Sequence, residues 1–302
     1  MIKNLEQNYI SVVLVVNEDN NQVENKIKEI KKVLNNNFEN NEIIIVDNTT
    51  KIDPLESLKS LDFNRTEVKL PIKHRTQQAL TAGTAIAIGD YSIEIEDISF
   101  DIDYNKIIEM YKKSQEGYDF VFLTPKKSRQ SSKIFYNILN RYFKNSFNED
   151  ISSSVMTLSS RRGQNKVAEV GKRVINRNVA YVVSGLKSTS IVVDMNYKNN
   201  RGFSENLMLM FDTLIYYTDA IMLFTQRLAF CFFGLFGLGV IYSLITKILK
   251  ETVEGWASLF ILISLGFFGI FFILSIIIRY LHHILKNSLN TKDYIYRSVD
   301  KK

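Results

Sequence analysis

The chain has 302 residues and 46% hydrophobic residues, which is ample for one large domain or two ordinary ones. Its single cysteine excludes a disulfide framework and a cysteine metal cluster. The formal net charge of +6 is moderate, and the sequence lacks a basic motif interleaved with aromatic residues, so we expect no nucleic-acid partner. Such a charge suits a protein that lies against the anionic cytoplasmic surface of a membrane.

The N-terminal third of the chain alternates buried strands with amphipathic helices. Residues 9–16, YISVVLVV, form a continuous β-branched run of the kind found in parallel strands that are buried on both faces. Apolar residues then recur at helical spacing as far as Leu34, and NEIIIVDN at 41–48 is a second buried strand. This order predicts a βαβ unit, whose polar strand ends lie along the edge where ligands of α/β sheets bind.

The same alternation continues along the chain. We expect further strands at 67–72, within 89–101 and at 120–125, and further helices at 76–87 and 104–119. The first 125 residues are therefore predicted to form an open α/β sheet. The later, less regular part favours a helix at 134–147, a serine-rich turn, a basic helix around 161–173, and strands at 180–185 and 188–195.

Two uncharged apolar stretches, 228–246 and 256–278, each approach the ~20 residues that a helix needs to cross a bilayer. The break at 247–255 is long enough only for a hairpin turn, so both flanks lie on one side. Arg227 and Arg279 flank the outer ends, whereas the lysines of the turn are matched by glutamates. The positive-inside bias predicts a multi-pass protein of the inner (cytoplasmic) membrane with both termini in the cytoplasm.

Acidic residues crowd the predicted strand at 89–101, GDYSIEIEDISFD. The five carboxylates belong to Asp90, Glu94, Glu96, Asp97 and Asp101. A pair of acids at a strand end can hold Mg²⁺ or Mn²⁺ against a diphosphate while other coordination positions stay open. Asp47 ends the second strand and is expected at the same edge, so this edge is the candidate functional site.

Three segments carry a family resemblance, in order along the chain. SVVLVVNEDNN…NEIIIVDN resembles the motif SVVIPVYNEEENI…EIIFVDDGS, and ALTAGTAIAIGDYSIEIEDISFD resembles ALLAGLDAARGDYVVVMDADLQD. KETVEGWASLFILI…RYLHHILKN is similar to a GWxSL second span followed by EYLGRIYxE. These motifs belong to the two-span bacterial type of family-2 polyprenyl-phosphate glycosyltransferases, which are related to dolichol-phosphate mannose synthase. The chain resembles that family over nearly its whole length.

The resemblance implies the fold and the division into domains. The expected fold class is α/β, with a GT-A (nucleotide-diphospho-sugar transferase) doubly wound mixed sheet, interfacial helices and a C-terminal two-helix transmembrane hairpin. The expected domains are a cytoplasmic glycosyltransferase-like domain at 1–203, juxtamembrane amphipathic helices at 204–227, two transmembrane helices at 228–278 and a cytoplasmic tail at 279–302. An amphipathic stretch rich in methionine and aromatic residues suits the bilayer interface.

The resemblance also implies a chemistry, the transfer of a sugar from a nucleotide-sugar donor to polyprenyl (undecaprenyl) phosphate for cell-surface glycan synthesis, with inversion at the anomeric carbon. The residues implied for the nucleotide are Asn17, Glu18 and Asp47. Those implied for a Mg²⁺ or Mn²⁺ cofactor are Glu96 and Asp97. Those implied for the diphosphate and the lipid phosphate are Arg161, Arg162, Arg201 and Arg227. No catalytic residue is assigned.

The chain departs from the family pattern at polar positions. The metal-binding DAD motif falls on Glu96, Asp97 and Ile98, so the second acid is missing from its usual place. A metal would then bind through Glu96 and Asp97, or through Glu94 and Glu96 on one strand face, or the acids form a solvated strand end without metal. VDDGS has become VDNTT, with Asn48 in place of an acid, and SDFRL aligns with residues that lack both its acid and its arginine.

These losses support an alternative function. They fall on chemistry-bearing positions, while the strands, helices and spans keep their apolar pattern. The alternative is a catalytically inactive glycosyltransferase-like subunit that scaffolds or regulates an active membrane partner. The expected assembly is either a homo-oligomer or a hetero-oligomer with an active paralogue.

Overall fold

The computed structural model describes most of the chain. The described residues are 5–18, 21–49, 55–126, 130–143, 151–170, 174–195, 203–249, 255–288 and 298–301. The chain divides into two compact units, Met1–Asp212 together with Asn290–Lys302, and Thr213–Leu289. The boundary between them falls inside one helix, and the four domains expected from the sequence stay a prediction.

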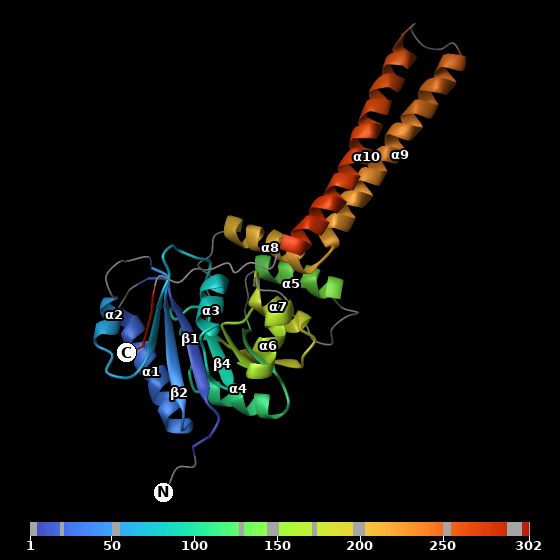
Figure 1. Cartoon of the computed structure of the whole chain (residues 1–302). Helices are drawn as coiled ribbons and strands as arrows, with labels where there is room; N and C mark the ends of the chain where they lie inside the picture. Colours follow the sequence, from blue (N-terminus) through green and yellow to red (C-terminus); the bar gives the residue numbers. More distant parts are fainter. Residues whose placement is uncertain are drawn as a thin grey trace. The chain divides into compact units, whose positions relative to one another are not determined.

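The first unit is built around one mixed sheet (Figure 1). Its strands are β1 (Ile10–Val16), β2 (Asn41–Asp47), β3 (Thr66–Lys69), β4 (Tyr91–Ile95), β5 (Phe120–Pro125), β6 (Met156–Ser160), β7 (Ser188–Val193) and β8 (Ser298–Lys301). They follow the spatial order β7-β5-β6-β4-β1-β2-β3-β8. Only β6 and β8 run antiparallel to their neighbours, so the carboxyl ends of the other strands share one edge.

Helices cover both faces of this sheet (Figure 1). Those of the first unit are α1 (Asn21–Asn37), α2 (Glu56–Lys59), α3 (Thr76–Thr84), α4 (Lys106–Gln115), α5 (Gln130–Phe143), α6 (Arg161–Val170) and α7 (Arg177–Val183), and α8 (Phe203–Tyr217) crosses into the second. On one face Val12 packs with Ile27 of α1 and Ile107 of α4, and on the other Val13 packs with Ala79 of α3. The predicted doubly wound α/β sheet is therefore confirmed.

Two segments differ from the sequence prediction. Residues 180–185 were expected as a strand, but most of them belong to helix α7. The side chain of Asn176 caps this helix by accepting a hydrogen bond from the Val179 amide at 3.3 Å, and that cap outweighs the β propensity of the segment. The predicted serine-rich turn contains β6, whose residues Met156 and Leu158 are buried between β4 and β5.

The C-terminal tail contributes the edge strand of the sheet. β8 pairs antiparallel with β3, and Lys69 lies opposite Ser298. No strand was expected in this tail, because four residues carry too little pattern to predict one. Of the tail expected at 279–302, residues 290–302 thus belong to the same compact unit as residues 1–212.

The second unit contains two long apolar helices, α9 (Ala220–Ile248) and α10 (Trp256–Ser288). Ala220–Ile248 has a mean hydropathy of 2.3 and Ser258–His282 one of 2.9, so each is long and apolar enough to cross a membrane. They pack through stacked rings, with Phe232 over Phe271 at 5.0 Å between centroids, while most of their other apolar side chains are exposed. This exposed apolar surface indicates membrane association, and the direction of insertion stays a prediction.

Gly83 allows α3 to lie close to the sheet. A Cβ atom at this position would collide with Val13 of β1 and would lie 2.8 Å from a methyl group of Val46 in β2. We predict that Gly83→Ala destabilises the first unit by about 1–3 kcal/mol through overpacking. Hydrogen exchange of the β1 and β2 amides measures this loss, and an unchanged protection of both strands would contradict the close packing.

Candidate functional site

Polar residues lie at or directly after the ends of three neighbouring strands, at the shared carboxyl edge of the sheet. β1 and β2 end at the paired residues Val16 and Asp47, and β4, on the other side of β1, ends at Ile95. Asn17 and Glu96 directly follow β1 and β4. Because neighbouring strands lie about 4.8 Å apart, these residues form one continuous polar rim. The structure thus brings together the predicted nucleotide residues and the predicted metal residues.

Near Asp47, the side-chain amide of Asn48 connects neighbouring segments of the rim. Asp47 is buried and accepts hydrogen bonds from the amide and hydroxyl of Thr49 at 2.9 and 2.6 Å. The Nδ2 group of Asn48 donates to Oδ1 of Asn17 and to the carbonyl of His74, and Oδ1 of Asn48 accepts from the His74 amide at 2.8 Å. A carboxylate has no donor with which to do this. Asn48 therefore connects the residue after β1 with the segment before α3 through its amide.

The acids after β4 are half-buried and fixed in position. Nε2 of Gln77, on α3, donates to Oε1 of Glu96 at 2.5 Å. Oδ1 of Asp97 accepts from the amide of Ser99 at 2.8 Å, which closes a turn immediately after the strand. Both carboxylates thus lie beyond the end of β4, at the rim.

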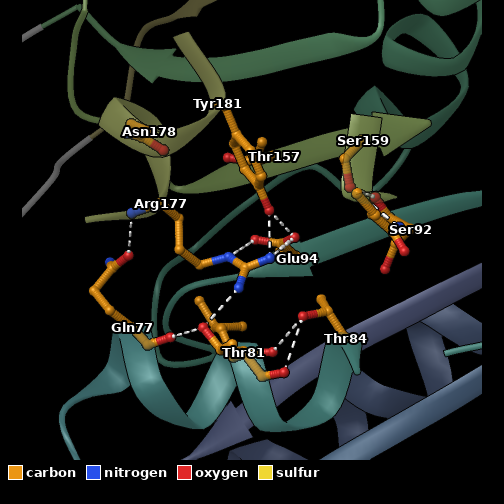
Figure 2. Close-up of polar contacts among 12 residues, drawn as sticks. Gln77, Thr81, Thr84, Ser92, Glu94, Thr157, Ser159, Arg177, Asn178 and Tyr181 are labelled. Atoms are coloured by element: carbon orange, nitrogen blue, oxygen red, sulfur yellow. Dashed lines mark hydrogen bonds and ion pairs between the residues drawn. The ribbon is translucent and has the colours of Figure 1, made fainter. Parts of the chain in front are cut away.

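Glu94 lies inside β4 rather than at the rim, and its carboxylate forms a buried ion pair with Arg177 (Figure 2). Arg177 donates from Nε and Nη2 to the two oxygens of Glu94, and both side chains are under 10% exposed. The Tyr181 hydroxyl donates to the same carboxylate, and Nη1 of Arg177 donates to the Thr81 hydroxyl at 2.9 Å. The hypothesis that Glu94 and Glu96 hold a metal together is therefore wrong, since Glu94 is already neutralised by a guanidinium.

The network fixes the protonation states of its members. Burial alone would lower the pKa of Arg177, but the Glu94 carboxylate and Tyr181 raise it above its ordinary value. Burial also raises the pKa of Tyr181 well above its ordinary value, and Glu94 adds to this, while Arg177 acts in the opposite direction. The tyrosine therefore stays protonated and the arginine charged.

Arg161 and Arg162 begin helix α6 and have structural partners. Nη2 of Arg161 donates to the carbonyls of Ala87 and Gly89 at 2.8 and 2.6 Å. Arg162 forms an ion pair with Asp119, which directly precedes β5. Burial alone would raise the pKa of Asp119, but Arg162 and Ser160 hold it below its ordinary value.

These contacts put both arginines at the amino ends of β4 and β5. Glu96 lies at the opposite edge of the sheet, beyond the whole length of β4, which is roughly 17 Å for five residues. An arginine side chain is too short to bridge that distance. The prediction that Arg161 and Arg162 hold the substrate phosphates is therefore wrong, because β6, which leads to them, runs antiparallel and reverses the direction of the chain.

The other predicted residues are less constrained. Glu18 is exposed next to Asn17 at the rim. Arg227 is exposed on α9, in the second unit. Arg201 lies outside the described residues.

The rim offers two carboxylates as ligands for a divalent cation that takes its other ligands from water and substrate phosphates. Among the described residues, no group of three or more acidic, histidine or cysteine side chains is placed to bind a metal. Mg²⁺ needs fewer protein ligands than this, since it commonly uses one or two carboxylates together with water and substrate phosphates. Glu96 and Asp97 fit that requirement.

Sequence reasoning missed the residues that organise the rim. Gln77, Arg177 and Tyr181 come from helices that cover one face of the sheet, and nothing in their spacing connects them with Glu94. The one available signal was Glu94 itself, a charged residue inside a buried strand, which demands a buried cation as partner.

The fold corresponds to a known class of protein. No family model matches the chain. The chain is 27% identical over 310 residues to YkcC of Bacillus subtilis (strain 168), described as an uncharacterized glycosyltransferase, and the match covers 94% of this chain and 92% of the relative. This homology supports a transferase.

Solved structures show the same architecture. Glucosyl-3-phosphoglycerate synthase from Mycobacterium tuberculosis, in complex with Mn²⁺, UDP and glucosyl-3-phosphoglycerate, has a TM-score of 0.51 at 14% identity, over 70% of this chain and 78% of that chain. Mannosyl-3-phosphoglycerate synthase from Rubrobacter xylanophilus has a TM-score of 0.50 at 10% identity, over 68% and 72%. The first unit therefore has a GT-A-like fold, as the sequence predicted.

Breaking the buried ion pair should be costly. We predict that Arg177→Met destabilises the first unit by about 3–5 kcal/mol, because the Glu94 carboxylate stays buried without a cation. The double variant Glu94→Leu, Arg177→Met should recover most of that loss. Hydrogen exchange of β4 amides measures both values, and a double variant no more stable than the single one would contradict this account.

The buried tyrosine should make stability fall at alkaline pH. The pKa of Tyr181 is raised in the folded state, so above its ordinary value of 10.0 the unfolded chain releases a proton that the folded chain keeps. The free energy of unfolding then falls by about 1.4 kcal/mol per pH unit for this group. Tyr181→Phe should reduce the slope, whereas Tyr142→Phe, at an exposed tyrosine on α5, should leave it unchanged.

Proposed function

We propose that this chain is a membrane glycosyltransferase that moves a sugar from a nucleotide-sugar donor to polyprenyl (undecaprenyl) phosphate. The observation that carries the proposal is the polar rim, where Asp47 at the end of β2, and Glu96 and Asp97 after β4, flank β1 at the edge where α/β sheets bind ligands. The homology to a glycosyltransferase over 94% of the chain supports it.

In this proposal the two ends of the rim have different roles. Asp47, with Asn17 and Glu18, contacts the nucleoside, and Glu96 and Asp97 hold Mg²⁺ or Mn²⁺. These two acids would hold the cation beside the leaving diphosphate, where it would supply positive charge. A phosphate oxygen of the lipid attacks the anomeric carbon, and the bond from that carbon to the diphosphate breaks with its electron pair on the diphosphate. The acceptor is already an anion, so the attack requires no general base.

In this proposal the apolar helices anchor the chain in the membrane that contains the lipid acceptor. α9 and α10 cross the cytoplasmic membrane as a hairpin, α8 lies at the interface, and Arg227 and Arg201 attract the lipid phosphate. The tail strand β8 supports this arrangement, because the segments before and after the hairpin belong to the same compact unit. In this proposal both ends of the hairpin lie on the cytoplasmic side, which is the side that the positive-inside bias predicts.

A second function is favoured by a specific observation. Glu94 is neutralised by Arg177, and Asn48 uses its amide to brace the strand ends, so two polar positions have been given structural roles. In this second function the chain binds no metal and acts as an inactive subunit, assembled as a homo-oligomer or with an active paralogue. That function predicts no metal-dependent binding of nucleotide sugar and co-purification with an active transferase.

The test is the joint removal of the two rim acids. Glu96→Ala with Asp97→Ala should reduce to background the Mn²⁺-dependent transfer of labelled sugar to undecaprenyl phosphate from a panel of nucleotide sugars. Asp103→Ala, which changes an exposed aspartate a few residues further on, is the matched control and should keep activity. Unchanged transfer by the double variant would remove these acids from the site, and a wild-type chain without metal-dependent nucleotide binding would favour the inactive subunit.

A further inference from the structure

Two side chains from opposite faces of the sheet converge on the acids after β4. Gln77 comes from α3, which covers one face, and Lys26 comes from α1, which covers the other. Gln77 contacts Glu96, and Lys26 contacts the turn that follows Asp97. The segment that carries the acids is thus held from both sides.

The amide of Gln77 has only one possible orientation. Its Oε1 accepts a hydrogen bond from the main-chain amide of Arg177 at 3.0 Å, so its NH₂ group must face Glu96 (the contact to Arg177 is drawn in Figure 2). Arg177 is the first residue of α7, where a main-chain N–H has no partner within the helix. Its side chain is anchored by the ion pair with Glu94. Gln77 is therefore a fixed donor aimed at one carboxylate oxygen.

Lys26 holds the turn through the main chain. Its ammonium group donates to the carbonyls of residues 98, 99 and 100 at 2.9, 2.8 and 2.9 Å. An ammonium group has three donors, so these contacts use all of them. The same turn is closed by Oδ1 of Asp97, which accepts from the amide of Ser99.

The turn matters because the two acids are consecutive. Successive side chains of an extended strand point to opposite faces, so Glu96 and Asp97 can share one ion only if the backbone leaves strand geometry between them. β4 ends at Ile95, and the turn held by Lys26 begins two residues later.

We propose that Gln77 and Lys26 are positioning residues that bring Glu96 and Asp97 onto one divalent cation, in place of the missing second acid of the family motif. The inference rests on the proposed function of these two acids. Groups that orient metal ligands by hydrogen bonding typically change metal affinity 10–100-fold when they are removed. Gln77 does this by directing a ligand oxygen, and Lys26 by fixing the backbone that carries the ligands.

The test measures Mn²⁺ affinity of the full chain in detergent, with UDP present, for three variants. Gln77→Met and Lys26→Met keep the length of the side chain and remove its donors, and each should weaken Mn²⁺ binding by about 10–100-fold. Lys32→Met, at an exposed lysine of the same helix, is the matched control and should bind as the wild type does. Saturating Mn²⁺ should restore kcat in both positioning variants, which a general loss of structure would not allow.

The outcomes separate the two proposals. If the wild type binds Mn²⁺ and both variants bind it with unchanged affinity, the positioning role is overturned and the proposed function still stands. A loss of kcat that saturating Mn²⁺ does not restore also overturns it, because the residues would then be needed for folding rather than for metal affinity. A wild-type chain that binds no Mn²⁺ overturns both proposals together.

Discussion

The buried ion pair between Glu94 and Arg177 is the interaction on which the rest of the first unit depends. A carboxylate inside a sheet strand is tolerable only if it is paired and fully hydrogen-bonded, and here a guanidinium and a phenol supply those bonds. The pair joins β4 to α7, and its extension through Thr81 and Gln77 reaches α3. Glu94 therefore helps to hold α7 and α3 against the sheet. The same hydrogen-bond network continues through Gln77 to Glu96 at the rim.

The same interaction distinguishes Glu94, which has a structural role, from Glu96 and Asp97, which are the proposed metal ligands. Glu94 faces a cation and is unavailable to a metal, whereas Glu96 and Asp97 lie past the strand end, where substrate phosphates and water could complete a coordination sphere. At the opposite edge of the sheet, Arg162 is matched with Asp119. Strand direction thus places Glu96 and Asp97 at one edge of the sheet and Arg162 at the other.

Much of the fold was predictable from local pattern, because β1 and β2 are continuous β-branched runs and α1 and α4 have clear apolar faces. The position of Asp47 and Glu96 followed from the rule that parallel strands share their carboxyl edge. Three things were not predictable. The segment around Tyr181 has β propensity, yet the cap at Asn176 and the anchor at Arg177 make it helical. Arg161 was misplaced because β6 was not recognised, and β8 depends on a partner strand more than 200 residues away in the sequence.

The central claim is that the rim after β4 holds a divalent cation against a nucleoside diphosphate. Anomalous X-ray diffraction at the manganese edge, on crystals grown with Mn²⁺ and UDP, tests it most directly. The account predicts a peak within coordination distance of one carboxylate oxygen of Glu96, one of Asp97 and one oxygen of the diphosphate. A peak elsewhere, or a rim occupied only by the side chains that brace it, would contradict the account.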